Sequence, residues 1–427
     1  MTNESNLKPS TARIAFASFI GTAIEFYDFY IYGLAVAMVI GPLFFPGSAP
    51  SAQALNAFLT FGIAFLARPI GALLFGHFGD KIGRKATLVA SLLVMGISTT
   101  LIGVLPSFEL IGWVAPALLC LLRFGQGIGL GGEWGGAALL AAEYAPQGKR
   151  GWFGMFPQLG PPIGFFCAVS SFLLLSYFLE EGQFRAWGWR IPFLASAALV
   201  IVGLYVRLKL TETPIFTQAI KSQQPVKLPL ALLLSRYPVP LLQGALAMVV
   251  CYALFYISTV FSLSYGVSTL KIPRPQFLGM LCISVIFMAA ATPLSAWSGD
   301  RFGRRPVLLV AGIAAFLSGF LLAPMLSSGS AWQITTFLSI ELFLMGATFA
   351  PMGALLPELF PTSVRYTGAG TAYNIGGILG ASLAPYLAQQ LVLFGGLSWV
   401  GGYVSAAAAI SLLAVFSMRE TRDRKLV

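Results

Sequence analysis

The sequence predicts an all-α integral membrane protein with twelve transmembrane helices in two six-helix bundles and with both termini in the cytoplasm. The 427-residue chain is 57% apolar and only 10% charged, and its mean hydropathy is +0.82. Soluble domains carry about 25% charged residues, so this composition excludes an ordinary soluble protein. A spanning helix takes roughly 20 apolar residues, and twelve such helices leave little of the chain for a separate catalytic domain.

Apolar windows between charged or glycine- and proline-rich breaks define the twelve predicted spans. A transmembrane barrel is excluded because its strands would alternate apolar and polar residues. The first apolar run carries no small-residue cleavage signature, so we interpret it as a span and not as a signal peptide. The predicted spans are 14–42, 54–77, 86–107, 112–142, 151–178, 188–209, 238–266, 276–298, 306–327, 331–356, 365–391 and 397–418.

The distribution of basic residues predicts the orientation. With a cytoplasmic N-terminus, 20 of the 26 lysines and arginines fall in inside segments and only four in outside segments. Cytoplasmic loops of membrane proteins carry this excess of positive charge. Both termini are therefore expected in the cytoplasm, which requires an even number of spans.

Three motifs occur twice, in the same order and at nearly the same offset. Such an internal repeat indicates two homologous halves in parallel orientation. We place the halves at residues 1–209 and 237–427, with residues 210–236 as a cytoplasmic linker. The repeated pairs are Gly79–Lys85 with Gly299–Arg305, Glu143–Arg150 with Glu358–Arg365, and Glu212-Thr213 with Glu420-Thr421.

Two of these motifs predict a cytoplasmic gate. In the Gly-Asp-x-x-Gly-Arg-Lys/Arg motif the glycines permit a tight turn, and the aspartate can accept hydrogen bonds from a helix N-terminus or from an arginine of another motif. Such charge pairs can lock one conformation and break in another; the alternative is a turn that only anchors at the anionic leaflet. The predicted gate residues are Asp80, Arg84, Lys85, Glu143, Arg150, Asp300, Arg304, Arg305, Glu358 and Arg365.

Six ionisable residues lie within predicted spans, where an unpaired charge costs several kcal/mol. Glu25 and Asp28 are three residues apart on one face of the first span, so their repulsion predicts that one of them holds a proton. Asp28 and Arg123 both come near mid-depth and are expected to pair. Arg68 and Glu133 are expected to form a second buried pair. The alternative is that these are static pairs that only hold helices together.

The same charges predict a proton-coupled anion site. Protonation of one carboxylate changes how many acids compete for Arg123, and a freed arginine can hold the acid group of a substrate. We therefore expect an anionic or zwitterionic small molecule as substrate and the proton as coupling ion. Asp28, Glu25 and Glu133 are the predicted proton-coupling residues, and Arg123 is the predicted substrate ligand.

Further polar and aromatic residues are candidate substrate ligands. An aromatic residue on a membrane helix is more often a packing residue. The sixth buried charge, Glu341, is equally consistent with a structural hydrogen-bonding role. The glycines between Gly125 and Gly136 in span four predict a close approach of neighbouring helices. The candidate ligands are Tyr27, Tyr30, Gln158, Tyr252, Tyr256, Tyr373, Asn374 and Glu341.

Several functional classes are excluded by what the chain contains. The single histidine, His77, and the four scattered cysteines form no hydrolytic set and no metal-ligand spacing. No continuous basic stretch with interleaved aromatic residues indicates nucleic-acid binding. We expect no enzyme activity, no metal and no cofactor.

The duplicated Gly-Asp-x-x-Gly-Arg-Arg/Lys turn resembles the signature of the major facilitator superfamily. The segments Gly21–Phe29, Ala67–Gly71 and Arg123–Glu133 are similar to its metabolite:proton symporter family, which includes carriers of shikimate, α-ketoglutarate, citrate and proline/betaine. The resemblance implies alternating access in a bacterial cytoplasmic (inner) membrane, with a monomer sufficient for function.

The predicted function is therefore proton-coupled symport, by which a small organic acid or related metabolite is taken up. Two alternatives stay open. The Gly-Pro-Pro-x-Gly of span five is reminiscent of drug:proton antiporters, although it is incomplete. Betaine or proline uptake is the other, but the osmosensing carriers of the family have a long C-terminal coiled coil, whereas this chain stops soon after span twelve.

Overall fold

The protein is helical in the described part of the chain. The computed structural model describes residues 11–47, 49–82, 84–132, 134–143, 145–146, 148–209, 229–361 and 364–424. Eleven segments of these residues are long and apolar enough to cross a membrane, and a shorter apolar helical stretch, Val89–Val104, lies in the third predicted span. The prediction of a twelve-span all-α membrane protein is confirmed.

The helices of the N-terminal half cover the first six predicted spans. Span one consists of α1, the π-helix η1 and α2; span four consists of α6 and α7. Short helices lie in the loops before spans four and six. The bounds are α1 Thr11–Ala35, η1 Val36–Ile40, α2 Gly41–Phe44, α3 Pro50–Ile82, α4 Arg84–Val104, α5 Phe108–Ile111, α6 Val114–Gly131, α7 Trp134–Glu143, α8 Arg150–Phe178, α9 Glu181–Ala186, η2 Gly188–Arg190 and α10 Ile191–Lys209.

The C-terminal half supplies the other six spans. Spans seven, ten and eleven are each built from more than one helical piece. The bounds are α12 Pro229–Arg236, α13 Pro238–Ala247, α14 Val249–Tyr256, η3 Ile257–Phe261, α15 Ser262–Ser268, α16 Arg274–Phe302, α17 Arg304–Leu326, α18 Ala331–Phe349, α19 Met352–Glu358, α20 Arg365–Gly377, η4 Ile378–Ser382, α21 Ala384–Gly395 and α22 Leu397–Ser417.

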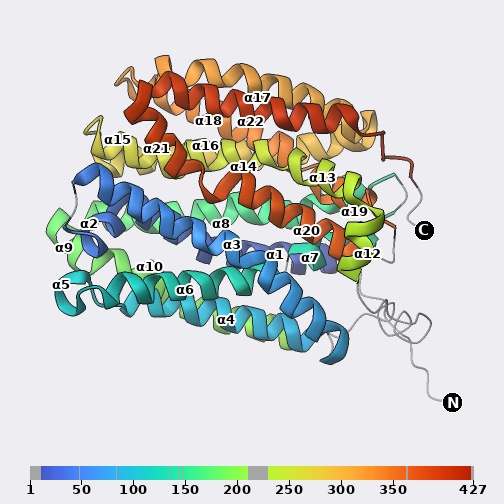
Figure 1. Ribbon diagram of the computed structural model, residues 1–427, viewed down its shortest axis with the longest axis horizontal. Helices are drawn as coiled ribbons and strands as arrows, with labels where there is room; N and C mark the ends of the chain where they lie inside the picture. The colour runs from blue at the N-terminus through green and yellow to red at the C-terminus, as the bar shows by residue number, and fades with distance from the viewer. Residues whose placement is uncertain are drawn as a thin grey trace.

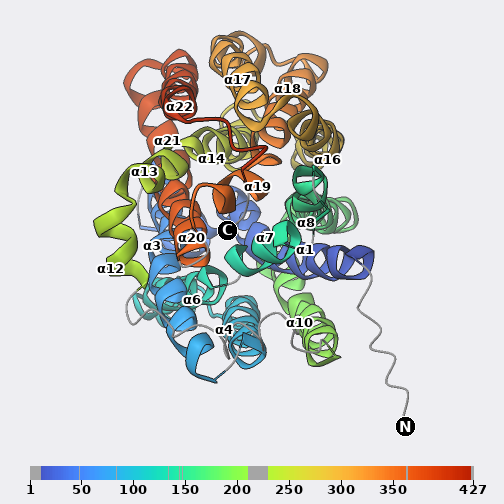
Figure 2. The same ribbon diagram turned by 90° about the vertical axis from the view of Figure 1, so that its right-hand side faces the viewer.

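The long helices run side by side along the longest axis of the molecule (Figure 1). Seen from one end, α4, α6 and α10 lie in the lower half of the picture and α14, α17 and α22 in the upper half, while α7, α19 and α20 meet between them (Figure 2). The helix α12 begins at Pro229 and lies within the predicted linker, whereas residues 210–228 lie outside the described residues. The exact boundaries of the two halves stay a prediction.

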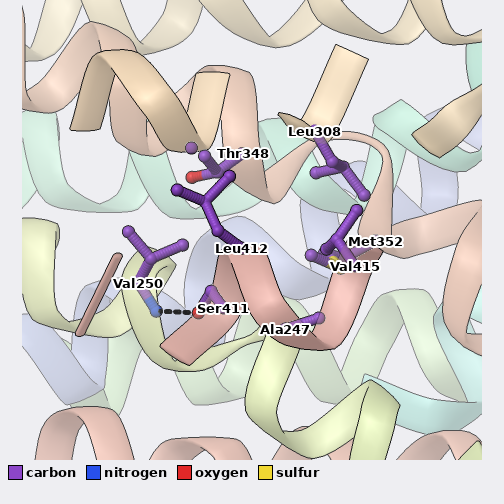
Figure 3. Close-up of a pocket in the computed structure, with 9 residues that line it drawn as sticks. Ala247, Val250, Leu308, Thr348, Met352, Ser411, Leu412 and Val415 are labelled. Carbon is purple, nitrogen blue, oxygen red and sulfur yellow. Dashed lines mark hydrogen bonds between the residues drawn. The ribbon is translucent and has the colours of Figure 1, made fainter. Parts of the chain in front are cut away.

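Span seven is interrupted between α13 and α14, and a serine of span twelve satisfies the backbone at the break. The N–H of Val250 donates to Ser411 Oγ at 3.0 Å (Figure 3). The Ser411 hydroxyl in turn donates to the carbonyl of Leu246 at 2.7 Å. Thr348, Leu412 and other side chains line a small space of about 10 Å³ beside it, which is about the minimum that one water molecule needs. Inside a membrane such backbone groups must be satisfied within the protein.

π-Helical turns interrupt three of the spans. The segments η1 and η3 lie at equivalent positions of spans one and seven, and η4 lies in span eleven. The hydroxyl of Ser382 in η4 donates to the carbonyl of Gly62 in α3 at 3.2 Å. π-Helical turns often mark functional positions of a helix, and here all three lie on spans that contact the opposite half.

The expected close approach of span four is confirmed. A Cβ atom at Gly127 would collide with the carbonyl of Ala64, and one at Gly131 would collide with the carbonyl of Arg68. Both collisions are with α3, so only glycine allows α6 to lie this close to span two. The approach brings the predicted site residues of the two spans together.

Candidate functional site

An aromatic cluster fills the interface between the two halves. Tyr30 of span one lies 4.7 Å from Phe255 of span seven, measured between ring centroids, and Phe61 of span two lies 5.1 Å from Tyr256 of span seven. These rings are almost fully buried. We use the name central aromatic cluster for Phe29, Tyr30, Phe61, Phe65, Trp134, Phe165, Tyr252, Phe255, Tyr256 and Tyr373.

Arg68 lies within this cluster and forms no hydrogen bond through its guanidinium to a described residue. Its guanidinium carbon is 4.5 Å from the centroid of Phe29 and 4.2 Å from that of Phe65, and the residue is 1% exposed. None of its three guanidinium nitrogens has a hydrogen-bond partner among the described residues. The rings offer cation–π attraction, which compensates only part of the cost of burying the charge.

Arg123 lies nearby, and neutral groups orient its guanidinium. Nη1 donates to Gln126 Oε1 at 2.6 Å, and Nη2 donates to the carbonyl of Phe61 at 3.1 Å. The guanidinium carbon lies 3.8 Å from the ring centroid of Tyr32 and 5.1 Å from that of Phe29. Nε has no partner among the described atoms. The described hydrogen-bond partners of Arg123 are therefore neutral, and none of them compensates its charge.

The expected pair of Asp28 and Arg123 is wrong for this conformation. Asp28 is fully buried, and neither carboxylate oxygen has a hydrogen-bond partner among the described groups. Its polar neighbour is Ser196 of α10, inside the N-terminal half. The physical reason is direction: the helix turns the Asp28 side chain toward Ser196 of span six and not toward span four. Glu25 is also buried and acts electrostatically on Asp28 and on Tyr373.

The expected pair of Arg68 and Glu133 stays a prediction. Glu133 lies outside the described residues. The backbone carbonyl of Arg68 lies against Gly131 of span four, because α6 packs tightly on α3 there.

Three more of the predicted ligands make hydrogen bonds or ring contacts between the halves, in addition to the tyrosines of the central aromatic cluster on spans one and seven. Gln158 donates to the carbonyl of Phe349 at 2.9 Å and accepts a hydrogen bond from Trp134 Nε1 at 3.1 Å. Trp134 in turn stacks on Tyr373, with 3.9 Å between the ring centroids. Asn374 Nδ2 points to the carbonyl of Gly131 at 3.5 Å. The structure thus brings Gln158, Tyr373 and Asn374 to the bundle interface, as it does Tyr252 and Tyr256.

Two other predicted ligands lie apart from this interface. The Tyr27 hydroxyl donates to the carbonyl of Pro192 at 3.4 Å, so this side chain packs inside the N-terminal half. Glu341 is fully buried beside Ser318 of α17, and its two carboxylate oxygens have no hydrogen-bond partner among the described groups. In Figure 2, α17 lies on the side of the C-terminal half that faces away from the other half. The position of a residue along its span does not predict the direction in which its side chain points.

At the predicted cytoplasmic end, Asp300 caps a helix of the opposite half. Helix α8 begins at Arg150, and no side chain of its own caps it. The N–H groups of Gly151 and Trp152 donate to the two carboxylate oxygens of Asp300, each at 2.8 Å. Arg304 Nη1 donates to the same carboxylate at 2.7 Å. The motif aspartate was expected to accept hydrogen bonds from a helix N-terminus or from an arginine, and Asp300 accepts both kinds.

Glu358 joins the same network from span ten. Its buried Oε1 lies 3.6 Å from Arg150 Nη1 of the N-terminal half and 3.6 Å from Arg304 Nη2. Its Oε2 accepts a hydrogen bond from the Thr421 hydroxyl at 2.6 Å. One carboxylate thus connects an arginine of each half at the cytoplasmic end.

Glu420 and Thr421 complete this network, and sequence reasoning recognised them only as a repeated pair. Glu420 accepts hydrogen bonds from the N–H groups of Arg304 at 2.9 Å and Arg305 at 3.0 Å, and so caps α17. Burial raises the pKa of Glu420, but the N–H groups of Arg422, Arg304, Arg305 and Thr421 lower it by more, so the pKa is lower than usual. Glu420 is therefore ionised at neutral pH.

The structure describes the side chains of only some of the remaining gate residues. Arg305 donates to the carbonyl of Phe416 at 2.8 Å, within the C-terminal half. Arg365 is buried and donates to the carbonyl of Phe360 at 3.3 Å. The side chains of Asp80, Arg84, Lys85 and Glu143 lie outside the described part, so their predicted roles stay predictions.

Comparisons with known proteins agree with this architecture. The family model for the sugar (and other) transporter matches residues 14–227 and 238–427. The chain belongs to this family. It is 51% identical over 422 residues to an inner membrane metabolite transport protein, YhjE, of Escherichia coli (strain K12), covering 98% of this chain and 96% of the relative.

Other relatives are named for specific molecules. The shikimate transporter of Escherichia coli (strain K12) is 38% identical, in an alignment that covers 98% of this chain and 97% of that transporter. The proline/betaine transporter of the same strain is 34% identical, covering 96% of this chain and 84% of its own. A structure of the major facilitator superfamily proton:xylose symporter XylE shares the fold, with a TM-score of 0.75 and 17% identity over 97% of each chain.

The expectation of a major facilitator transporter in the bacterial inner membrane is confirmed. The protein is a transporter of small molecules and not an enzyme. No three His, Cys, Asp or Glu side chains among the described residues gather into a candidate metal site.

Proposed function

We propose that this transporter takes up a small organic acid together with protons by alternating access. The observation that carries the proposal is the pair of buried arginines at the interface of the halves. All described hydrogen-bond acceptors of Arg123 are neutral, and Arg68 has none. A carboxylate substrate would supply the missing negative charge and could accept two parallel hydrogen bonds from one guanidinium.

The relatives support an acidic substrate. One is named for shikimate and one for proline and betaine, and each of these molecules carries a carboxylate. The aromatic walls of the cluster would hold the apolar part of such a molecule by contact with Phe65, Tyr252 and Tyr256, whose rings already face one another across the interface. We therefore propose Arg123 as the anchor of the acid group, with Arg68 adding to the positive potential.

Asp28 is the carboxyl group that we propose to carry the coupling proton. It is fully buried without a hydrogen-bond partner among the described groups, so a proton on it removes the cost of burying its charge. Glu25 lies one helical turn away and adds repulsion to a negative Asp28. A proton on Asp28 would remove a negative charge from the N-terminal half, which would favour loading of an anionic substrate, and release of the proton would favour unloading.

A direct test is uptake into proteoliposomes that contain the purified transporter. A panel of radiolabelled organic acids, with proline and betaine included, is supplied while an inward proton gradient is imposed and then collapsed. We expect one acid to accumulate only while the gradient lasts. Betaine accumulation would favour the osmolyte alternative, and gradient-driven loss of preloaded compound would replace symport by antiport.

We further propose that the network of Asp300, Arg304, Glu358 and Arg150 keeps the cytoplasmic entrance closed. The network joins the two halves through the N-terminus of α8 and through Glu358. It must break when the site opens to the cytoplasm, because Asp300 and Gly151 belong to opposite halves.

Replacement Asp300→Asn is expected to expose the cytoplasmic side of this interface. Asparagine removes the charge that both the α8 N-terminus and Arg304 bind, a loss of about 1.5 to 3 kcal/mol. The reporter is Ala354→Cys, a buried position of α19 beside Gly154 of α8. In inside-out vesicles, labelling by a membrane-impermeant maleimide should rise roughly tenfold or more.

The matched control is Asp423→Asn, which removes an exposed acid at the same end that pairs only with Arg422 in the described structure. Asp423→Asn should leave labelling of the Ala354→Cys reporter unchanged. Equal labelling of the reporter in Asp300→Asn and in Asp423→Asn would contradict the proposed gate.

A further inference from the structure

At the opposite end of the molecule, an arginine of the C-terminal half inserts into the N-terminal half. Arg274 is the first residue of α16 and is only 8% exposed. Its Nε donates to Ser176 Oγ of α8 at 2.9 Å, and its Nη2 donates to Glu181 Oε2 of α9 at 2.7 Å. Its guanidinium carbon lies 3.6 Å from the ring centroid of Phe184, which is fully buried. We call Arg274, Ser176, Glu181 and Phe184 the external latch.

This contact differs from an ordinary surface ion pair. Exposed pairs contribute little because water competes for both groups, and Glu181 alone is well exposed. Arg274, however, is desolvated and satisfies a hydroxyl, a carboxylate and an aromatic face of the other half at once. Separation of the halves at this end would break all three contacts together.

The loop that presents Arg274 is tied back to span seven. The N–H groups of Thr269 and Leu270 donate to the carbonyl of Tyr265, at 2.9 and 3.1 Å, and the N–H of Ile272 donates to the carbonyl of Gly266 at 3.0 Å. Lys271 in this loop has a φ of 57°, the one positive φ of a non-glycine residue in the described chain. Such a conformation is costly and persists where surrounding contacts enforce it.

Span seven leads from the latch to the central aromatic cluster. The loop is bonded to α15, which follows η3, which follows α14 with Tyr252 and Tyr256. In η3, Val260 lies against span one: a Cβ at Gly33 would be 3.2 Å from Val260 Cγ2. The outer part of span seven therefore covers the cluster on the external side, and the latch holds its end.

We propose that Arg274 is a positioning residue for transport: it latches the outer part of span seven to the N-terminal half, and its release admits substrate from the external side. The latch is the external counterpart of the Asp300 network. It rests on the transporter's use of alternating access but not on the identity of the substrate or on proton coupling.

The test measures access to the interface and needs no substrate. The reporter is Ser264→Cys, a nearly isosteric change at a position that is 6% exposed and one turn outward from Val260. It is placed in a chain whose four native cysteines are replaced. In right-side-out vesicles, labelling by a membrane-impermeant maleimide should rise on the order of tenfold in Arg274→Ala, and by a smaller factor in Glu181→Gln.

Arg185→Ala is the matched control. Arg185 binds the same carboxylate at 2.6 Å, but it belongs to the same half as Glu181 and makes no described contact across the interface. In Arg185→Ala, labelling of the Ser264→Cys reporter should stay as slow as in the otherwise unmodified protein. If Arg185→Ala and Arg274→Ala label equally, or if neither changes the rate, the latch is refuted.

Unfolding is separated from opening by a second reporter. A chain that keeps only Cys251, which is fully buried inside the C-terminal half, should stay unlabelled in the Arg274→Ala background. Labelling of Cys251 in this background would attribute the exposure to unfolding and would contradict the latch. Failure of the uptake panel to find an acid substrate would overturn the proposed function and leave this result standing.

Discussion

Replacement of Asp28 by asparagine is expected to abolish proton-driven accumulation of the substrate while leaving its exchange intact. Asparagine has nearly the same shape but cannot take up or release a proton, so the coupling ion loses its carrier. With one proton per substrate, a gradient of two pH units can sustain roughly 100-fold accumulation in the unmodified protein. In Asp28→Asn the accumulation ratio should fall to about one, measured in proteoliposomes under the same gradient.

Exchange at equal pH provides the control for this variant. Labelled substrate outside should still exchange with unlabelled substrate inside, because the binding residues and the gates are unchanged. Glu341→Gln provides the comparison, since Glu341 is equally buried and also lacks a described hydrogen-bond partner, but lies inside the C-terminal half. Full accumulation by Asp28→Asn, or loss of coupling in Glu341→Gln alone, would show that the proton is carried elsewhere.

Replacement of Arg123 by alanine is expected to remove most of the substrate affinity. Arg123 is held by Gln126 and by the carbonyl of Phe61, and no described acid compensates its charge. Loss of one partner of a buried, hydrogen-bonded charge pair costs about 2 to 5 kcal/mol, which predicts a decrease in affinity of about 30-fold or more. Substrate-induced thermal stabilisation of the purified protein measures this without any need for transport.

Two further variants test whether Arg123 binds the acid group of the substrate. Arg123→Lys keeps the charge but loses the planar fork, so it should bind more weakly than the unmodified protein and better than Arg123→Ala. Arg236→Ala removes an exposed arginine far from the cluster and should bind normally. Normal affinity in Arg123→Ala together with a large loss in Arg68→Ala would move the anchor to Arg68.

The architecture could be predicted from the sequence because the bilayer imposes simple rules. Each predicted span lies on helices of the structure, including span four with its run of glycines, since backbone groups in lipid must bond internally. The repeat of Gly79–Lys85 as Gly299–Arg305 indicated two halves, and it predicted that the motif aspartate accepts hydrogen bonds from a helix N-terminus or from an arginine; Asp300 accepts them from both.

Side-chain directions within the spans could not be predicted. In a helix surrounded by lipid and by other helices, an apolar periodicity does not distinguish the two environments, so it does not predict the direction of a side chain. Asp28 faces Ser196, and Tyr27 bonds to the backbone of Pro192. The external latch left no sequence signal either, because Arg274 and Glu181 stand at the starts of two helices, 93 residues apart, and no repeated motif links them.

Glu420 and Thr421 show an intermediate case. Their repetition after spans six and twelve indicated a constrained pair, but only the structure shows that Glu420 caps α17 and that Thr421 binds Glu358.

Coupling of proton and substrate is the central claim, and proton movement driven by substrate tests it most directly. Proteoliposomes with a trapped pH-sensitive dye start at equal pH and receive the accumulated acid on the outside only, with the membrane potential clamped. Symport predicts that the lumen acidifies as the substrate enters, and that vesicles containing Asp28→Asn show no change. Alkalinisation of the lumen, or substrate entry through the unmodified transporter without any pH change, would contradict the proposed mechanism.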